Sequence, residues 1–142
     1  SQYYYFRLLK DKQFCDKTFV YGLPELQRDL IIKAHYIANP GCFATAIQLG
    51  LLPLIEKDLI ESEIHTNAIT GSTGAGIKPS PTTHFSWRNN NLSWYKPFTH
   101  QHLGEIGETL DNPKLYFLPQ RGDFTRGIFA SCYTFFDGNL ED

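Results

Sequence analysis

Apolar residues recur at helical spacing soon after the start of the chain. In "GLPELQRDLIIKA" (22–34), Pro24 suits the first position of a helix, because its ring fixes φ and it has no N–H to satisfy. The apolar positions that share one helical face are Leu26, Leu30, Ile31 and Ala34. This spacing predicts a helix that begins at residue 24.

Two further stretches have helical periodicity. From Cys42 to about Ile60 the chain is apolar on most faces, which is typical of a buried helix, although Pro53 interrupts the pattern. The segment "THQHLGEIGETL" (99–110) predicts a helix capped by Thr99. Its apolar side consists of Leu103, Ile106 and Leu110.

Strand patterns alternate with these helices. "EIHTNAITG" (63–71) alternates apolar and polar residues, and "KLYFLPQ" (114–120) also favours a strand. "GIFASCYTFF" (127–136) is apolar and aromatic on both faces, so we expect it in the centre of a sheet. "HYIANPG" (35–41) predicts a short extended run, and residues 71–98 favour loops and turns. The fold class that follows is α/β or α+β.

Composition narrows the functional classes. The chain has 142 residues, 42% of them hydrophobic and 20% charged, with a net charge of −2. It therefore has neither the basic excess of a nucleic-acid binder nor the charge excess of a disordered chain. The apolar stretches are shorter than the roughly 20 residues that cross a bilayer, and the first residues do not resemble a signal peptide. We expect a cytoplasmic protein, because three widely separated cysteines do not suggest a disulfide framework.

Cys42, in "NPGCFAT" (39–45), is a candidate nucleophile. It stands where the predicted helix begins, so unpaired backbone N–H groups and the helix dipole would favour its thiolate form. The alternative is a buried apolar cysteine, a common environment for a free thiol. Cys15 and Cys132 fit that alternative better, because neither stands at a predicted helix start.

A nucleophilic cysteine usually needs an acid or base partner. His100 and His102, in "HQH", would point to the same side of an extended entry to the helix. A zinc site is a second interpretation of His-x-His, but no Asp, Glu or Cys cluster stands nearby at ligand spacing, so we expect no metal. A solvated pair without a function is the third.

Two other patterns permit anion binding. The glycines of "GSTGAG" (71–76) follow a predicted strand and leave backbone N–H groups free to face an anion, but the segment matches neither a P-loop nor the dinucleotide fingerprint. "PQRGDFTRG" (119–127) places Arg121 and Arg126 in a turn, where each could hold a carboxylate or phosphate. Neither pattern is specific by itself.

Taken together, six segments resemble the N-acetyl-gamma-glutamyl-phosphate reductase family in order along the chain, and "NPGCFAT…LGLLP" is the most specific of them. The six are "YGLPEL", "IANPGCFATAIQLGLLPL", "AITGSTGAG", "HFSWRNNN", "YKPFTHQHLGEI" and "RGDFTRGIFAS". The resemblance implies a catalytic domain like the C-terminal domain of glyceraldehyde-phosphate dehydrogenases, with a mixed, largely antiparallel sheet and helices on one face. Such an enzyme uses NADPH, without a metal, to reduce an acyl phosphate in arginine biosynthesis.

The resemblance also implies roles for individual residues. Cys42 would displace phosphate and form a thioester, and the acid/base histidine would be His102, with His100 as a substrate or neighbouring contact. The loop near the nicotinamide would contribute Ser72, Gly74 and Gly76. Candidates for binding the substrate carboxylate or phosphate are Arg88, Arg121 and Arg126. A homo-oligomer, a dimer or tetramer, would be the working form.

The sequence departs from the family in its extent. No glycine fingerprint precedes these segments, so we expect residues 1–40 to be the tail of a nucleotide-binding domain and residues 41–142 a catalytic and dimerisation domain without its C-terminal segment. Such a fragment is expected to have little reductase activity by itself. Three alternatives remain open: a non-catalytic dimerisation module, an enzyme like aspartate-semialdehyde dehydrogenase, and a cysteine hydrolase that needs no NADPH.

Overall fold

A four-stranded mixed sheet forms the centre of the fold. The computed structural model describes residues 17–60 and 62–136. The strand order in this sheet is β4 (Ser93–Trp94), β5 (Leu115–Arg121), β3 (Ile64–Thr70), β6 (Ile128–Tyr133). β3 runs parallel to β5 and antiparallel to β6, and β4 is antiparallel to β5. The mixed sheet with two antiparallel pairs agrees with the expected architecture.

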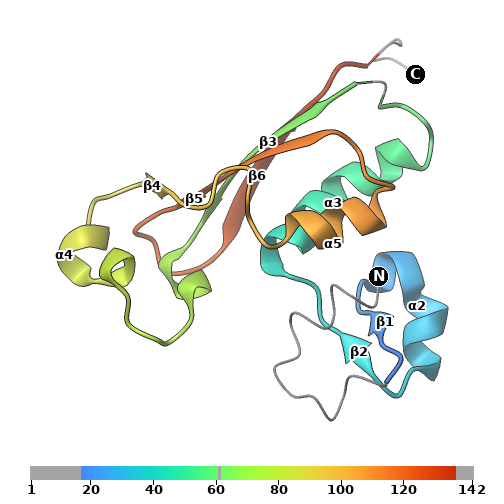
Figure 1. The fold of residues 1–142 in the computed structure, drawn as a ribbon, viewed down its shortest axis with the longest axis horizontal. Helices are drawn as coiled ribbons and strands as arrows, with labels where there is room; N and C mark the ends of the chain where they lie inside the picture. The colour runs from blue at the N-terminus through green and yellow to red at the C-terminus, as the bar shows by residue number, and fades with distance from the viewer. Residues whose placement is uncertain (1–16, 61, 137–142) are drawn as a thin grey trace.

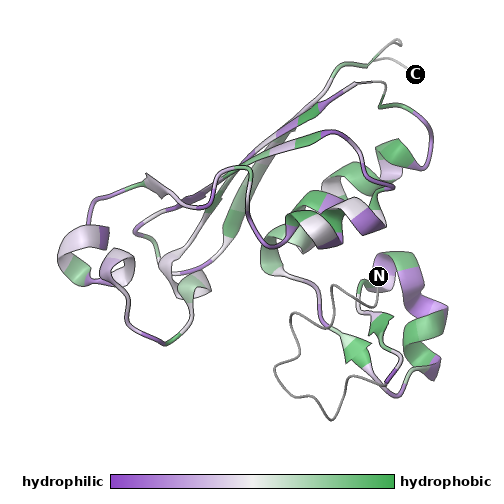
Figure 2. Ribbon diagram, in the orientation of Figure 1, coloured by the Kyte–Doolittle hydropathy of each residue, from purple (hydrophilic) through white to green (hydrophobic). Residues whose placement is uncertain are grey.

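Two helices cover one face of this sheet. α3 (Cys42–Ile55) and α5 (Leu103–Thr109) lie side by side beneath β3 and β5 (Figure 1). α3 is apolar along most of its length (Figure 2), and its Phe43, Ile47 and Leu51 are almost completely buried. They pack with Ile64, Ala68 and Phe117 of the sheet and with Ile106 and Leu110 near α5. This layer is the hydrophobic core, and it fixes the start of α3 against the start of α5.

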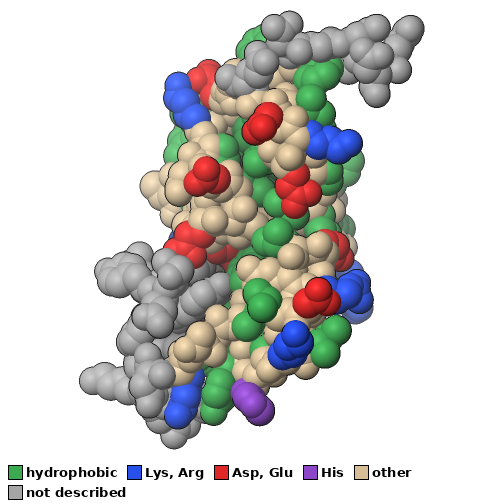
Figure 3. Space-filling view, turned by 90° about the vertical axis from the view of Figure 1, so that its right-hand side faces the viewer, with side chains coloured by type: hydrophobic (Ala, Val, Ile, Leu, Met, Phe, Trp, Pro, Cys, Tyr) green, Lys and Arg blue, Asp and Glu red, His purple; other side chains and the backbone are tan. Residues whose placement is uncertain are grey.

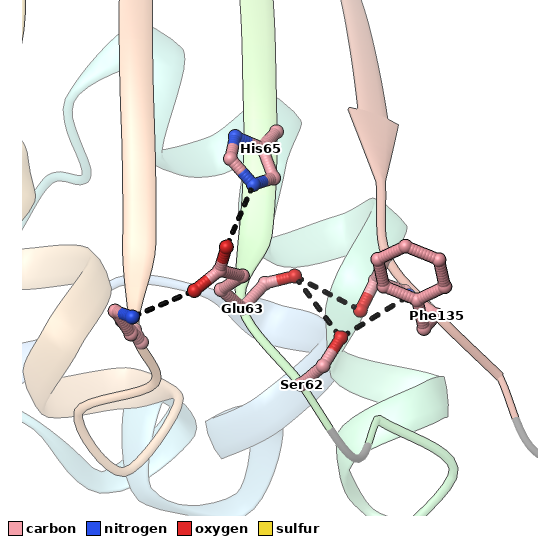
Figure 4. A network of polar contacts seen from close by, with 6 residues as sticks. Ser62, Glu63, His65 and Phe135 are labelled. Atoms are coloured by element: carbon pink, nitrogen blue, oxygen red, sulfur yellow. Dashed lines mark hydrogen bonds and ion pairs between the residues drawn. The ribbon is translucent and has the colours of Figure 1, made fainter.

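The alternation predicted for residues 63–71 is observed in β3. Ile64, Thr66, Ala68 and Thr70 are buried, whereas His65 and Asn67 are exposed on the opposite face. At the entrance to β3, Glu63 accepts a hydrogen bond from Lys114 at 2.6 Å and lies 3.5 Å from His65 (Figure 4). Each face of the sheet is thus set by the period of two along the strand.

A smaller unit precedes the main sheet. β1 (Val20–Tyr21) and β2 (Ile37–Ala38) form a parallel pair, joined by α2 (Pro24–Lys33). Figure 1 shows this unit below α3 and α5. Pro24 is the first residue of α2, as predicted, but no residue of α2 is buried. On its apolar face, Leu30 is 57% exposed, whereas Leu26, Ile31 and Ala34 are partly buried.

At the other end of the sheet a loop-rich lobe connects β3 to β5. It contains the short helices η2 (Ser72–Ala75), η3 (Pro81–Thr83) and α4 (Phe85–Arg88), followed by β4. Figure 1 shows this lobe extending away from α3 and α5. Within residues 71–76, expected to be a loop, Ser72–Ala75 thus form a short 3₁₀ helix.

Three expectations about the elements need correction. β6 is an edge strand among the described strands, not a central one, because its only neighbour there is β3. α3 ends at Ile55 rather than near residue 60, and Asp58 adopts a left-handed conformation (φ 53°) just beyond it. α5 begins at Leu103, after a turn, so Thr99 does not cap it.

One face of the molecule shows charges of both signs. On the face drawn in Figure 3, acidic and basic side chains are interspersed with apolar ones. Among residues 17–60 and 62–136, the helices are all too short or too polar to cross a membrane.

Candidate active site

Cys42 occupies the first position of α3. Gly41 precedes it as the N-cap, with an extended backbone (φ −66°, ψ 148°), and the Gly41 carbonyl accepts a hydrogen bond from Thr45 N at 2.9 Å. The thiol of Cys42 is exposed. The predicted helix start is therefore confirmed, and a buried apolar role for Cys42 is wrong. Its sulfur lies at the end of the helix where unpaired N–H groups favour an anion.

Gly41 is also where the two helix starts touch. A Cβ added to Gly41 would collide with the His102 imidazole at Nε2 and would lie 2.6 Å from Glu105 Oε1. Because real Cβ atoms do not approach so closely, any residue other than glycine at this position would force the His102 ring or the Glu105 carboxylate to move. The missing side chain is what places the His102 ring beside the residue that precedes Cys42.

Glu105 fixes the turn from the α5 side. Its side chain is 3% exposed, and its oxygens accept the Gly41 N–H at 3.0 and 3.1 Å. Burial raises the pKa of this carboxyl, while hydrogen bonds from Gly41 N and the Tyr21 hydroxyl oppose the rise. Glu105 thus joins α5 directly to the backbone of the Pro40–Gly41–Cys42 turn.

His102 has the properties expected of a proton carrier. It is the N-cap residue of α5 and is partly buried. Burial, with a smaller effect of the Lys96 charge, lowers the pKa of its imidazole, so the neutral base is favoured. Its Nδ1 is buried and has no hydrogen-bond partner among the described residues.

His100, by contrast, is enclosed by rings. It is 4% exposed, and its edge faces Phe43, Tyr95 and Phe117 at centroid distances of 5.4 to 5.5 Å. Its Nδ1 accepts the His102 N–H at 3.2 Å. Burial lowers the pKa of His100 to about 4, with smaller contributions from the charges of His102, Lys96 and Arg121. The two histidines are brought together by this turn, with ring centroids 4.5 Å apart, rather than by extended alternation.

Tyr95 and Arg121 complete the cluster of side chains around Cys42. The Arg121 guanidinium lies 4.3 Å from the centre of the Tyr95 ring, and Arg121 Nε is buried without a hydrogen-bond partner among the described residues. Burial raises the pKa of the Tyr95 hydroxyl; Arg121 opposes the rise, and the negative charge of a Cys42 thiolate adds to it. The Tyr95 hydroxyl is therefore within electrostatic range of the sulfur, and the Arg121 cation lies against the Tyr95 ring.

Arg88 lies in a different setting. It is 6% exposed, and its five N–H donors are all used: Nε and Nη2 donate to Thr82 O, Nη1 to Asn91 O and Arg121 O, and Nη2 to Ser93 Oγ. Its guanidinium thus ties η3, the turn after α4, β4 and β5 together. The prediction that Arg88 binds substrate remains a prediction, but every donor it would use is already bonded.

The glycine loop is bonded to the loop that carries Arg126. Gly71 N, Ser72 N and Thr73 N donate to carbonyls of Gly127, Phe124 and Thr125, and Gly74 N and Gly76 N donate within the turn. Those N–H groups are therefore not free to hold an anion, as the sequence pattern had allowed. Ser72 is partly buried, whereas Gly74, Gly76 and Arg126 are exposed.

Of the remaining cysteines, Cys132 is exposed on β6, where its sulfur lies 3.3 Å from Thr66 Oγ1. The expectation that it is buried is wrong, because it lies on an edge strand. Cys15 lies outside the described residues. Within the described part of the chain, no group of three or more His, Cys, Asp or Glu residues could hold a metal ion.

Sequence reasoning missed four residues near this site: Tyr21, Gln48, Tyr95 and Glu105. Each lies in a segment that resembles the reductase family, but its residue type alone does not indicate a role in a functional site. Glu105 follows His102 by three positions, and this spacing places both on one side of a helix. That spacing was the only available signal.

Comparisons with known proteins show the family of this chain. Residues 42–142 match the family described as "Semialdehyde dehydrogenase, dimerisation domain". The chain belongs to this family. The match begins at Cys42, which is also the first residue of α3.

Curated relatives share a more specific name. The chain is 61% identical to the N-acetyl-gamma-glutamyl-phosphate reductase of Flavobacterium johnsoniae, over 96% of this chain and 44% of that protein. It is 64% identical to the reductase of Azobacteroides pseudotrichonymphae, over 87% of this chain and 39% of that protein. These relatives confirm the resemblance found in the sequence. The chain spans less than half the length of these relatives.

Solved structures share the fold. Aspartate semialdehyde dehydrogenase II from Vibrio cholerae superposes with a TM-score of 0.63 at 16% identity, over 86% of this chain and 45% of that chain. A structure of the same enzyme complexed with ASA gives a TM-score of 0.59, also at 16% identity, over 80% of this chain and 43% of that chain. The expected fold class, a mixed sheet with helices as in the glyceraldehyde-phosphate-dehydrogenase-like catalytic domains, is confirmed.

Proposed function

We propose that this chain is the catalytic part of an N-acetyl-gamma-glutamyl-phosphate reductase, which converts the acyl phosphate to the semialdehyde and releases phosphate. The observation that carries the proposal is the contact of His102 with Gly41, directly before the exposed Cys42 at the start of α3. Nucleophile and base thereby come from two helices held in contact by a glycine. The relatives' shared name supports the choice of substrate.

In this reaction the Cys42 thiolate attacks the γ-carbonyl carbon, the carbon–oxygen bond to phosphate breaks, and a thioester forms on Cys42. NADPH, when bound, supplies the hydride that reduces this thioester. His102 donates a proton to the oxygen of the reduced carbon and takes it back as the carbon–sulfur bond breaks, which releases the aldehyde and regenerates the thiolate. A base favoured in its neutral form suits His102 for removing the thiol proton at the start of this cycle.

Arg121 and Tyr95 are proposed to hold the substrate. Arg121 has a buried Nε without a partner among the described residues, and buried donors normally bind an acceptor. A substrate carboxylate or phosphate would supply that acceptor, with the Tyr95 hydroxyl nearby. Arg126, exposed on the 122–127 loop, is the second candidate for this contact, and Arg88 is the third. His100, neutral above a pKa of about 4, would fix the orientation of His102 rather than transfer protons.

The cofactor contact is proposed for the turn at residues 71–76. Because five of its N–H groups are bonded within the protein, Ser72, Gly74 and Gly76 would pack against the nicotinamide rather than grip a phosphate. An added Cβ at Gly76 would meet nothing within 4 Å, so a flat ring has room there.

We expect the chain tested alone to have little reductase activity, because its relatives are more than twice as long. We place the enzyme in the cytoplasm on the basis of its cysteine content.

Substitution of the nucleophile tests the reaction. In an enzyme that joins this chain to a nucleotide-binding domain, Cys42→Ser should abolish NADPH oxidation by the acyl phosphate while circular dichroism remains unchanged. Cys132→Ser is the matched control, because Cys132 is equally exposed but lies on β6. Activity in Cys42→Ser, or turnover of aspartyl phosphate in place of the glutamyl substrate, would contradict the proposal. Hydrolysis of an activated ester without NADPH would favour a cysteine hydrolase.

We also propose that two copies associate through the open face of the sheet. This face carries Tyr116, Leu118, Phe129 and Tyr133, and Phe129 and Tyr133 are 69% and 64% exposed. Apolar groups of this kind gather at subunit contacts, and the description of the matching family as a dimerisation domain supports a second copy as the occupant. A monomer in sedimentation across micromolar concentrations would contradict this proposal.

A further inference from the structure

A buried polar network connects three elements and ends at the turn before Cys42. The Tyr21 hydroxyl of β1 lies 2.9 Å from Gln48 Oε1 of α3 and 3.0 Å from Glu105 Oε2 of α5. Gln48 Nε2 donates to the Glu105 backbone carbonyl at 3.2 Å. The other end of the network is the Gly41 N–H, which donates to both Glu105 oxygens.

This network is enclosed by the protein. Gln48, Glu105 and Tyr21 are 0%, 3% and 7% exposed. Burying a carboxylate, an amide and a phenol costs free energy unless these groups form hydrogen bonds with one another. Apolar side chains of similar volume in their place would often give a fold that is at least as stable. Stability alone therefore explains this network poorly. Because the network ends at the Gly41 N–H, the group that it holds in place is the turn directly before Cys42.

We propose that Glu105 is a positioning residue for Cys42, and that Tyr21 and Gln48 hold Glu105 in place. The inference rests on the proposed function of Cys42. By binding Gly41 N–H, Glu105 fixes the peptide unit directly before the nucleophile. On α5 it follows His102 by three positions, so the same helix turn places the acid/base ring and the carboxylate against Gly41.

A consequence concerns the segment before the catalytic domain. Tyr21 lies in β1, outside residues 42–142 that match the dimerisation-domain family. The β1–α2–β2 unit would therefore act on the reacting sulfur through one hydroxyl group. A mechanism confined to residues 42–142 would omit this contact.

The test measures the rate at which iodoacetamide alkylates Cys42, followed by peptide mass spectrometry under conditions where circular dichroism shows a folded chain. Tyr21→Phe removes only the hydroxyl, and Tyr36→Phe is the matched control on the same unit, where the ring contacts Phe19 at 5.5 Å. Displacement of the Gly41 turn would move the Cys42 sulfur away from the helix-start N–H groups that favour the reactive thiolate, and alkylation slows as the thiolate fraction falls. We expect Tyr21→Phe to slow alkylation at least about fivefold and Tyr36→Phe to leave it unchanged.

Variants of Glu105 keep the proposal testable if Tyr21→Phe does not fold. Glu105→Gln retains an oxygen that can accept the Gly41 N–H, whereas Glu105→Ala removes it, so alkylation should be slower in the alanine variant than in the glutamine variant. In the enzyme joined to a nucleotide-binding domain, kcat should fall with KM nearly unchanged. Wild-type alkylation rates in folded Tyr21→Phe and Glu105→Ala would overturn the inference. Because alkylation requires no reductase activity, this result is separate from a failure of the proposed reaction.

Discussion

Gly41 is the residue on which the geometry of the candidate site depends most directly. Its φ of −66° is open to any amino acid, so the requirement for glycine comes from its neighbours rather than from its backbone. Cys42 and the two histidines could be predicted from the sequence, because each stands in a recognisable pattern. The contact of His102 with Gly41 could not, because it joins residues that lie far apart in the chain.

A pair of glycine substitutions tests this contact. Gly41→Ala should lower the free energy of unfolding by about 1–3 kcal/mol, because the added Cβ collides with the His102 ring and lies 2.6 Å from Glu105 Oε1. Gly50→Ala, in the interior of α3, meets nothing within 4 Å and should raise it by about 0.5–1 kcal/mol. Urea unfolding measures both. Equal effects of the two substitutions would show that the close approach is relieved without cost.

His100 makes stability depend on pH. Burial lowers the pKa of His100 from 6.5 to about 4. Between these two pH values the imidazole is therefore protonated in the unfolded chain but neutral in the folded chain. The free energy of unfolding should be unaffected by His100 above pH 6.5 and should fall by up to about 3 kcal/mol as pH drops towards 4.

Urea unfolding at pH 7.5 and pH 5 measures this loss. His100→Gln keeps a group that can accept the His102 N–H but cannot titrate, so it should lose less stability between the two pH values than the wild type. The same pH dependence in both proteins would assign the effect to other groups.

At the scale of elements, the positions of the core strands and helices agree with the hydrophobic pattern. The place of β6 in the sheet and the start of α5 do not, because a local pattern does not specify the neighbours of an element. β3, β5, α2 and α3 begin within one or two residues of their predicted positions. The sequence of β6 is apolar on both faces, which predicts a central strand, yet Phe129 and Tyr133, which share one face, are exposed. A period of two identifies a strand but not its place in the sheet. Thr99 fits a capping pattern, but the bond between His102 N and His100 Nδ1 delays the start of α5.

Arg88 illustrates a role that composition could not reveal. Its five hydrogen bonds hold the lobe between β3 and β5, and lysine cannot replace the planar fork of donors. Arg88→Lys should therefore lower the free energy of unfolding by about 2–4 kcal/mol, because buried carbonyls lose their donors.

Arg126→Lys is the control, since Arg126 is exposed; we expect a change within about 0.5 kcal/mol. Thermal unfolding of the two variants measures the difference. An Arg88→Lys variant as stable as the wild type, with a raised KM for the acyl phosphate, would instead assign Arg88 to the substrate.

At the scale of the whole molecule, the two faces of the sheet have different roles. One face lies under α3 and α5, and the other carries exposed aromatic residues. Phe129→Ser should weaken the proposed association of two copies at least tenfold, because a large apolar side chain leaves the contact. Ile77→Ser is the control, because Ile77 is fully exposed in a loop away from this face. Sedimentation equilibrium measures both constants, and equal effects would place the contact elsewhere.

The pairing of β3 also has a consequence for how the chain folds. Ile64 pairs with Leu115 and Thr66 with Cys132, so the central strand finds both its neighbours only after long loops have closed. Loop closure of this kind costs entropy before it gains contacts, and chains rich in such pairings fold slowly. α3 can form locally, whereas the long loops that join β3 to β5 and β6 must close before the sheet is complete. The exposed thiol of Cys42 at the start of α3 would therefore be open to oxidation in partly folded states before the sheet has formed.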